Sequence, residues 1–208
     1  MTFPSELASV LTGASMSQLS HWRSAPALLA PEVASKPKAL YSFRDIVALR
    51  TFVRLRRELP LQRIRTALST LQDYDLTDHP SSYQLVTDSK TVFLVDDEGK
   101  DMVDLVKRRG QTVLLSMADV FAPFTNLQGQ DVVDFRRPRQ NIEVREKRMG
   151  GWPTIAGTRL RYDTVALLLS DGSVQPEETQ YYYPEVSAEA ALDAADFDFS
   201  VQQRRQTR

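Results

Sequence analysis

The chain has 208 residues, enough for one or two hydrophobic cores, and it contains no Cys, which excludes disulfides and thiolate metal sites. Its net charge of −1 hides an uneven distribution: residues 1–72 carry ten Lys and Arg against four acids, whereas residues 163–200 carry nine acids and no base. No apolar run approaches the roughly 20 residues of a membrane span, and no signal peptide is recognisable. We therefore expect a cytoplasmic protein with an anionic partner for its basic segment and no membrane partner.

Two short helices are predicted at the start of the chain. Ser5 is expected to cap the first helix, which runs to about Leu11, and Gly13 follows it as a helix end. Ser15 and Gln18 have the spacing of a capping box for the second helix. The inward positions of that helix recur at three-residue steps: Met16, Leu19 and Trp22. Its outward positions are Ser17, Gln18 and His21, with Ser20 and Arg23 at the margins.

Three prolines between Ser24 and Leu40 predict a loop or short extended ribbon. Ser42 and Asp45 form a second capping-box pattern, which predicts a helix over 43–59. Pro60 is expected to end that helix and begin the next. The positions expected to be buried on these two helices are apolar at helical spacing: Ile46, Leu49, Phe52, Val53, Leu61, Ile64, Leu68 and Leu71. The polar segment 73–82 is interpreted as a domain boundary.

The middle of the chain is predicted to be rich in strands. Segments 83–86, 91–95 and 102–106 have strand composition, and 96–99 has the composition of a turn. The acids of this turn, Asp96, Asp97 and Glu98, suit a solvated turn better than a metal site. Periodicity does not decide whether 113–121 is a helix or a strand.

The last segment is predicted to mix a strand with helices. A strand is expected over 141–145, with Ile142 and Val144 on one face, and an extended segment over 154–160. Helices are expected through 165–169, from Pro176, and from a cap at Ser187. The fold class is therefore α+β, mainly α. We predict three domains: a helical unit at 1–75, a β-rich linking and dimerisation section at 82–140, and a second helical unit at 141–208.

The two N-terminal helices have the spacing of a DNA-binding unit, in which the second helix enters a major groove. Short polar side chains suit base edges, and Lys side chains on the following loop suit phosphates. The candidate DNA-binding residues are Ser15, Ser17, Gln18, Ser20, His21, Arg23, Lys36, Lys38 and Arg44. An ordinary helical hairpin with a polar outer face explains the same pattern equally well.

The residues at 7–15, 19–22, 28–31 and 41–46 together resemble the MerR-type winged helix-turn-helix. The resemblance covers roughly residues 5–72. It implies that the helix at 15–23 contacts DNA bases and that 31–40 forms the wing. Ser20 and Ala39 stand where that family usually carries Arg.

The sequence Gly150-Gly151-Trp152-Pro153-Thr154-Ile155-Ala156-Gly157-Thr158-Arg159-Leu160 resembles the signature of a bacterial domain family of unknown function, family 433, often described as antitoxin-like. The resemblance covers roughly residues 141–200, and it implies a helix-turn-helix-like domain at 141–208. Joined to a MerR-like N-terminus, it looks like VapB-type antitoxins, which pair with PIN-domain ribonucleases. This implies a homodimeric autorepressor that binds operator DNA and a PIN-domain toxin. A flexible tail carrying Arg204, Arg205 and Arg208 is expected to insert into the acidic metal pocket of the toxin.

The sequence lacks a catalytic constellation, so we expect no enzyme activity, no cofactor and no metal. Its two histidines, His21 and His79, fall on an outward helix face and in a linker. Three further motifs are interpreted structurally: Gly157-Thr158-Arg159 as a turn, Trp152 as a core or interface anchor, and the basic run 136–139 as a solvated linker rather than a phosphate contact. The tyrosines at 181–183 are expected to pack at an interface.

Two other functions fit the sequence. One is a stand-alone transcription regulator whose C-terminal half senses a ligand. The other is an interaction scaffold without DNA binding. The salt dependence of binding to the chain's own upstream region separates the last from the other two, because phosphate contacts weaken steeply with salt.

Overall fold

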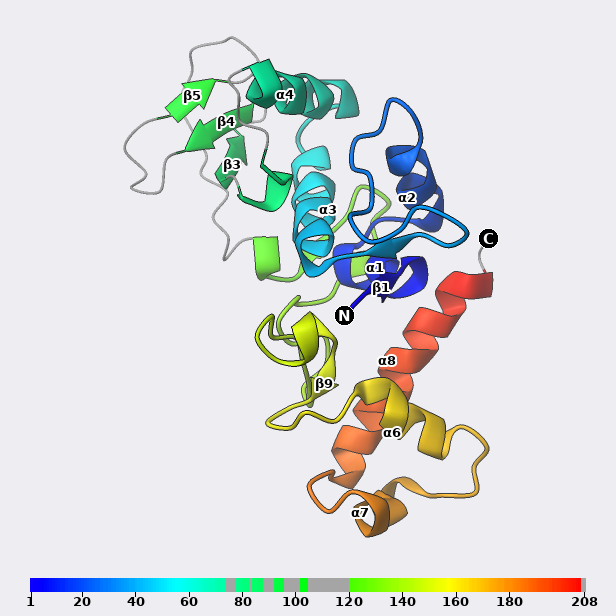
Figure 1. Cartoon of the computed structure of the whole chain (residues 1–208). Helices are drawn as coiled ribbons and strands as arrows, with labels where there is room; N and C mark the ends of the chain where they lie inside the picture. The colour runs from blue at the N-terminus through cyan, green and yellow to red at the C-terminus, as the bar shows by residue number, and fades with distance from the viewer. Residues whose placement is uncertain (74–77, 83, 88–91, 96–101, 105–119, 207–208) are drawn as a thin grey trace.

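A computed structural model describes residues 1–73, 78–82, 84–87, 92–95, 102–104 and 120–206 (Figure 1). The fold is α+β, with one block of helices and several small antiparallel sheets. The predicted turn at 96–99 and most of the undecided segment 113–121 lie outside the described residues. Among the described helices, none combines the length and the apolar character that crossing a bilayer requires.

The N-terminal helices form where the sequence predicts them. After strand β1 (Phe3–Pro4), helix α1 (Ser5–Thr12) ends at Gly13, whose φ of 77° is left-handed. The expected cap at Ser5 is wrong: Pro4 takes the N-cap position, because β1 holds it extended with ψ 159°. Helix α2 (Met16–Arg23) has both hydrogen bonds of the predicted capping box.

The second predicted capping box is also present. Strand β2 (Leu40–Tyr41) pairs with β1, and helix α3 (Phe43–Arg56) begins with reciprocal bonds between Ser42 and Asp45. The helix ends three residues earlier than expected, and α4 (Leu61–Asp73) follows Pro60. Its burial follows the predicted stripe, with Ile64 buried and Leu61 and Leu68 packed against the core.

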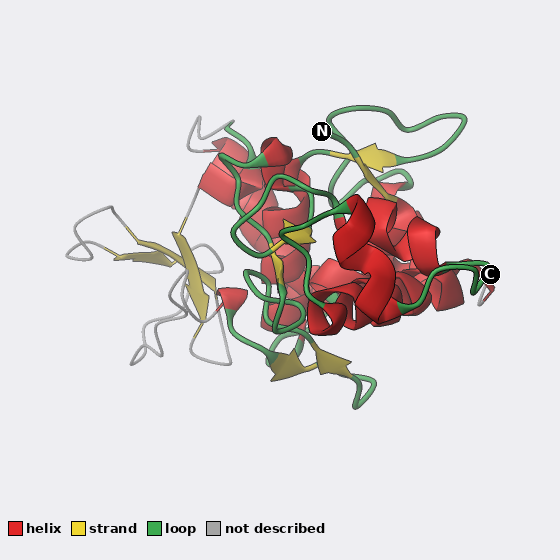
Figure 2. Cartoon of the chain, turned by 90° about the horizontal axis from the view of Figure 1, so that it is seen from below, coloured by secondary structure: helices red, strands yellow, loops and turns green. Residues whose placement is uncertain are grey.

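The middle section contains the three predicted strands. Strands β3 (Gln84–Thr87), β4 (Val92–Val95) and β5 (Met102–Asp104) form an antiparallel sheet in chain order, preceded by the 3-10 turn η1 (Pro80–Ser82). Figure 2 shows this sheet projecting to one side of the helical block. Strands β6 (Phe124–Thr125) and β7 (Asp131–Val132) form a separate hairpin around the predicted loop at 126–130.

The C-terminal segment packs three helices beside a two-stranded sheet. Strands β8 (Ile142–Glu143) and β9 (Thr154–Ile155) pair across the 3-10 turn η2 (Met149–Gly151). Helix α6 (Tyr162–Leu169), the 3-10 turn η3 (Pro176–Glu178) and helix α7 (Thr179–Tyr182) follow. The last helix, α8 (Ala188–Gln206), packs against α6 and against α1 (Figure 1).

The N-terminal and C-terminal segments share one hydrophobic core. Trp152 stacks on Phe3, with ring centroids 5.8 Å apart, and it is buried, which confirms its predicted role as an anchor. Tyr162 meets Phe197 edge-on at 4.8 Å, and burial raises the pKa of its hydroxyl. The core therefore joins segments that the sequence assigns to different domains.

A buried arginine also joins distant segments. Arg50 of α3 has no exposed surface, and its guanidinium donates to five main-chain carbonyls: those of Leu11, Val120, Phe121, Ala122 and Val133. Desolvation lowers its pKa to about 10, partly offset by the negative charge of Asp134, so the side chain stays cationic at neutral pH. Arg50 therefore fixes the start of the 120–135 segment against the N-terminal helices.

Candidate nucleic-acid interface

The outer face of α2 carries three exposed polar side chains. Ser17, Ser20 and His21 are exposed, whereas Leu19 and Trp22 are buried. Trp22 meets Phe52 of α3 edge-on at 6.5 Å, which fixes the rotation of α2 on the core. Ser20 is fully on the outer face rather than at its margin. The predicted outward positions of Ser17 and His21 are therefore confirmed, while their contact with a duplex stays a prediction.

Two of the candidate DNA-binding residues are engaged in capping. Ser15 Oγ accepts from Gln18 N at 3.1 Å, and Gln18 Oε1 accepts from Ser15 N at 2.8 Å. The amide oxygen of Gln18 is thus occupied, while its Nε2 donors stay available. A bidentate contact to adenine needs both amide atoms. Gln18 can therefore contribute a donor to a guanine edge, a thymine oxygen or a phosphate while the capping box is closed.

The loop predicted as a wing is closed by a β-bridge. Ala34 and Leu40 exchange two main-chain hydrogen bonds of 3.2 and 2.8 Å, so residues 35–39 form a short projecting turn. Lys36 and Lys38 are both exposed on this turn. Two ammonium groups on a loop held at its base suit contacts with a phosphate backbone.

Arg23 and Arg44 are less free than the sequence suggests. Arg44 is exposed but pairs with Glu32, with 3.6 Å between Nη1 and Oε1. Arg23 is half-buried beside Tyr41. Burial raises the pKa of the Tyr41 hydroxyl, and the positive charge of Arg23 offsets part of that increase. Their charges are therefore partly committed within the fold, and their DNA contacts stay predictions.

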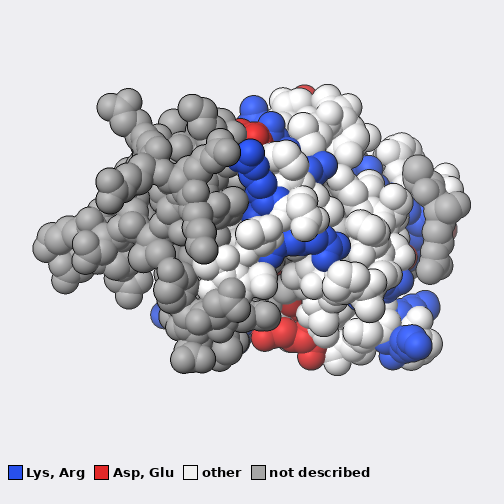
Figure 3. Space-filling model, turned by 90° about the horizontal axis from the view of Figure 1, so that it is seen from above, with Lys and Arg blue, Asp and Glu red and all other residues white. Residues whose placement is uncertain are grey.

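Four further arginines extend the basic surface beyond the predicted set. They lie at the end of α3 and on α4: Arg56, Arg57, Arg63 and Arg65. Arg65 Nη1 donates to the carbonyl of Pro26 at 2.5 Å, which ties α4 to the loop after α2. Figure 3 shows basic side chains gathered across the described part of this face, with few acids between them. The sequence signal for these four arginines was the net positive charge of residues 1–72, which does not identify particular side chains.

His79 does not lie in an open linker. Its Nε2 is 3.0 Å from Oδ1 of buried Asp45, and its Nδ1 is 2.8 Å from Ser81 Oγ. Asp45 Oδ2 accepts from the main chain of Glu32 and Ser42. Within the described segments, Glu32, Asp45 and His79 have donor atoms close enough to share a cation. Because hydrogen bonds already satisfy Asp45, we interpret the cluster as a structural connection between η1 and the start of α3.

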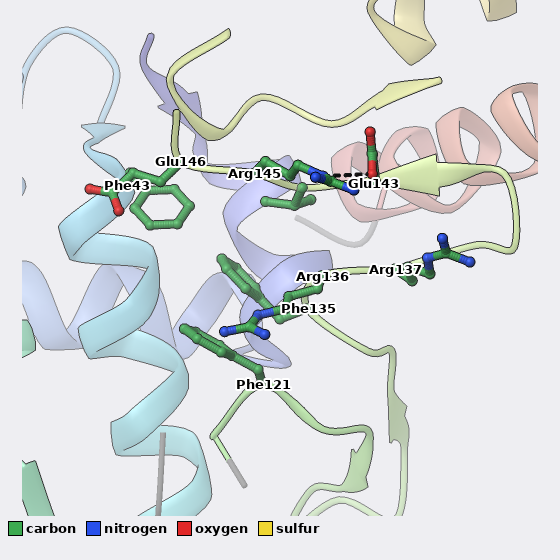
Figure 4. A pocket seen from close by; sticks show the side chains of 9 residues that line it. Phe43, Phe121, Phe135, Arg136, Arg137, Glu143, Arg145 and Glu146 are labelled. Atoms are coloured by element: carbon green, nitrogen blue, oxygen red, sulfur yellow. Dashed lines mark hydrogen bonds and ion pairs between the residues drawn. The ribbon is translucent and has the colours of Figure 1, made fainter. Parts of the chain in front are cut away.

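A hollow of about 430 Å³ lies between α3 and the segment 121–146 (Figure 4). Its wall is aromatic, with Phe121 stacked on Phe135 at 5.1 Å. Arg136 lies 4.9 Å over the Phe121 ring and points into the hollow, whereas Arg137 points away. Aromatic walls beside a guanidinium suit a small planar anion.

Glu143 of β8 also lines this hollow. It is buried, accepts from Gly157 N at 2.9 Å, and pairs with Arg145 at 2.8 Å and with Arg148. Gly157 has φ 79°, and Thr158 Oγ1 bonds to Ile155 O at 3.0 Å. The predicted turn at 157–159 is therefore confirmed, and Glu143 anchors it.

The expectation of a flexible arginine tail is wrong for the described residues. Helix α8 continues to Gln206, and Val201 is buried against the core, so Arg204 and Arg205 belong to the last helical turn. Arg208 lies outside the described residues. The basic run 136–139 is divided: Arg136 and Arg137 are exposed, as a solvated segment predicts, whereas Arg139 pairs with Asp196 at 2.5 Å.

The tyrosines at 181–183 divide between surface and core. Tyr181 and Tyr182 of α7 are 87% and 58% exposed, whereas Tyr183 packs against the core. Acidic Glu177 and Glu178 precede them. The predicted interface role of the first two tyrosines therefore needs a partner outside this chain.

Comparisons with known proteins support part of this picture. A family model described as "Protein of unknown function (DUF433)" matches residues 142–197. The fold is similar to that of the crystal structure of Rv2018 from Mycobacterium tuberculosis, with a TM-score of 0.55 and 19% sequence identity over 93% of this chain and 96% of that one. No curated protein matches the chain. The C-terminal resemblance is thus confirmed, while the MerR-type resemblance stays a prediction.

Proposed function

We propose that this protein is the antitoxin and autorepressor of a toxin–antitoxin pair, which binds operator DNA as a homodimer and neutralises a PIN-domain ribonuclease. The observation that carries the DNA-binding part is the outer face of α2. It presents Ser17, Ser20 and His21, and the loop that follows the helix exposes Lys36 and Lys38. The helix is held in place by its capping box and by buried Trp22, so these side chains are presented without further ordering.

The basic residues around α2 support a phosphate-contacting role for the rest of this face. The turn at 35–39 belongs to the loop after α2, and Arg65 of α4 donates to Pro26 in the same loop. In a protein–DNA interface such residues fix the position on the duplex, and the groove-facing residues provide sequence discrimination. We therefore assign Lys36 and Lys38 to phosphates and the α2 serines to base edges.

The toxin-binding part rests on the antitoxin-like resemblance of the C-terminal segment and on its free surface. Arg205 is exposed and Arg204 half-exposed at the end of α8, and the tyrosines of α7 project from an acidic surface. The arginines would then approach the acidic pocket of the ribonuclease from a helix end.

Binding to the chain's own upstream region tests the DNA-binding part. The double substitution Lys36→Ala and Lys38→Ala should weaken binding to all sequences and reduce the slope of log K against log salt by about 2. Ser17→Ala with Ser20→Ala should instead reduce the preference for the upstream region over unrelated DNA. Lys147→Ala, an exposed lysine in the turn after β8, is the matched control and should bind normally. Wild-type protein that ignores its upstream region at low salt, with the neighbouring gene product also present, would refute this part.

Co-purification with the product of the neighbouring gene tests the toxin-binding part. Because deleting residues after 200 would remove buried Val201, substitution is the cleaner probe. Arg204→Ala with Arg205→Ala should release the ribonuclease activity, whereas Arg159→Ala, on an exposed turn, should not. Full inhibition by the double variant would exclude these arginines as the inhibitory group.

One observation favours a second candidate function, a stand-alone regulator that senses a ligand. The aromatic hollow with Arg136 lies against α3, so an anion bound there would contact the helix that packs on α2. This function predicts that Arg136→Ala leaves DNA affinity unchanged but removes its response to small aromatic carboxylates. No response of the wild-type protein to such anions, together with an adjacent ribonuclease gene, favours the antitoxin.

A further inference from the structure

The hollow beside α3 has aromatic rings on two sides. Buried Phe135 lies between them: its ring centroid is 5.7 Å from that of Phe43 in α3 and 5.1 Å from that of Phe121. Phe43 and Phe121 are themselves partly exposed, so a ligand can reach both rings. The volume of about 430 Å³ falls within the usual range for small-molecule sites. The hollow can therefore take a planar ring together with a further group attached to it.

The uncommitted charges of the hollow are separated by sign. The Arg136 guanidinium lies 4.9 Å over the ring of Phe121. Figure 4 shows the Glu146 carboxylate near the ring of Phe43, and both residues line the hollow. Arg136 and Glu146 are exposed, and within the described segments no ion pair engages either of them. A ligand between the rings therefore meets a cation on one side and a hydrogen-bond acceptor on the other.

The other charged side chains of the hollow leave this division in place. The buried carboxylate of Glu143 is already balanced by Arg145 and Arg148, and it accepts from Gly157 N at 2.9 Å. Arg137 points away from the hollow, so it is placed to meet a second anionic group outside it (Figure 4). The positive charge thus continues from the wall of the hollow to its exterior.

We propose that this hollow binds a nucleotide unit, with an amino-bearing base between the rings and the phosphate on Arg136. Adenine, cytosine and guanine each carry an exocyclic amino group, which can donate to the carboxylate of Glu146. A phosphate accepts two parallel hydrogen bonds from a guanidinium. A simple aromatic carboxylate provides the ring and the anion but no donor for Glu146. The nucleotide is therefore the ligand that matches both charged groups.

This chemistry is offered by a free nucleotide and by an unpaired base of a single strand. Aromatic rings beside Arg side chains are a common platform for such bases. A duplex does not offer it, because its bases are stacked and paired, so the hollow is distinct from the α2 face. The proposal rests on the site of the ligand-sensing function and narrows its ligand from an aromatic anion to a nucleotide. The binding itself requires neither operator DNA nor a toxin.

Calorimetry on the full chain without duplex DNA tests the ligand. Adenosine monophosphate should bind about tenfold more tightly than uridine monophosphate, whose base has no amino group to donate to Glu146. Benzoate should bind more weakly than both. A single strand of about ten adenines tests the second source of the same chemistry. A strand that binds far more tightly than the monophosphate identifies single strands as the ligand, and equal affinities identify the free nucleotide. Failure of both to saturate, or benzoate binding as tightly as the nucleotide, would overturn the proposal.

Three substitutions test the roles of the side chains. Arg136→Ala should weaken binding of the nucleotide by about tenfold. Glu146→Gln should remove the preference for the adenine over the uracil nucleotide, because an amide can pair with either base. Phe121→Leu keeps an apolar side chain but removes the aromatic face, and it should weaken both nucleotides by about fivefold.

Arg159→Ala removes a cation from an exposed turn outside the hollow and is the matched control, which should bind normally. Circular dichroism checks that each variant keeps its helices. Wild-type affinity in Arg136→Ala, or an unchanged base preference in Glu146→Gln, would contradict the assignment.

The outcomes also separate this inference from the proposed function. A protein that binds the adenine nucleotide but ignores its upstream region retains the nucleotide site and loses the DNA-binding proposal. A protein that binds its upstream region but neither the nucleotide nor the single strand loses the nucleotide site alone.

Discussion

The N-terminal and C-terminal halves of this protein each bury a charged side chain, and they stabilise it in opposite ways. Among the described residues, Arg50 donates to five main-chain carbonyls from three separate places in the chain, at 11, 120–122 and 133. Glu143 has two arginines and one main-chain N–H, all within fourteen residues of it. The first charge therefore organises long-range structure, and the second organises one local turn.

The comparison predicts that the two halves respond differently to loss of their buried charge. Long-range contacts are lost together when their centre is removed, because every acceptor is then left buried without a donor. Local contacts are partly replaced by water, since the arginines around Glu143 are not fully buried. Four sets of substitutions test how the two halves are stabilised.

The largest effect is expected for Arg50→Met. This change leaves five carbonyls without their donor, and we expect the free energy of unfolding to fall by about 3–5 kcal/mol. Urea denaturation followed by circular dichroism measures it. Arg50→Lys keeps the charge but has only three donors, so it should lose part of this stability. Arg57→Met, at an exposed position, is the control and should change stability by less than about 0.5 kcal/mol. A similarly small loss for Arg50→Met would show that the carbonyls find other partners.

The next effect concerns a glycine at which the two halves touch. Gly151 has φ 82°, and a Cβ there would lie 2.2 Å from a ring carbon of Phe43. Gly157 has a similar φ of 79°, but a Cβ there meets no atom within 4 Å. Gly151→Ala should therefore cost about 2–4 kcal/mol, from strain and overpacking together, and Gly157→Ala about 1 kcal/mol from strain alone. The difference between the two variants in thermal melts gives the part of the loss that comes from the contact with Phe43. Equal losses would mean that Phe43 moves aside freely.

The features that the sequence predicted correctly are local. Both capping boxes link residues three apart, and the turn at 157–159 depends on a glycine and a threonine next to each other. The buried stripe of α3 follows from apolar spacing within one helix. The α2 surface, the core of the candidate site, could be derived for the same reason: its inward and outward positions are set by helical periodicity.

The features that the sequence did not predict join distant residues. His79 and Asp45 are 34 residues apart, and Arg50 reaches carbonyls up to 83 residues away. No periodicity carries this information, because it depends on how the elements pack. The alternation of Ile142 and Val144 does not show that β9 and the turn at 157 cover Glu143 between them. The helical state of Arg204 and Arg205 was missed since it depends on Val201 reaching the shared core.

Glu143→Gln should have a smaller effect than the glycine substitution. The amide keeps an acceptor for Gly157 N–H but loses both ion pairs, of which the one to Arg145 is screened because that side chain is 61% exposed. We expect a loss of about 1–2 kcal/mol in the free energy of unfolding. Glu146→Gln, at an exposed position, is the control and should be neutral within about 0.5 kcal/mol. A loss as large as that of Arg50→Met would contradict the local character of the Glu143 contacts.

The smallest effects are expected when one helix cap is removed in each half. Ser42 shares a reciprocal capping box with buried Asp45, whereas Ser187 makes a single bond of 3.2 Å to Ala190 N at the start of α8. Ser42→Ala should cost about 1 kcal/mol and Ser187→Ala about 0.5 kcal/mol, since the first removes a bond from a buried network and the second a bond that water can replace. Urea midpoints at constant m-value resolve this difference. If Ser187→Ala costs more, the start of α8 is held by its cap rather than by its buried residues Ala190 and Ala194.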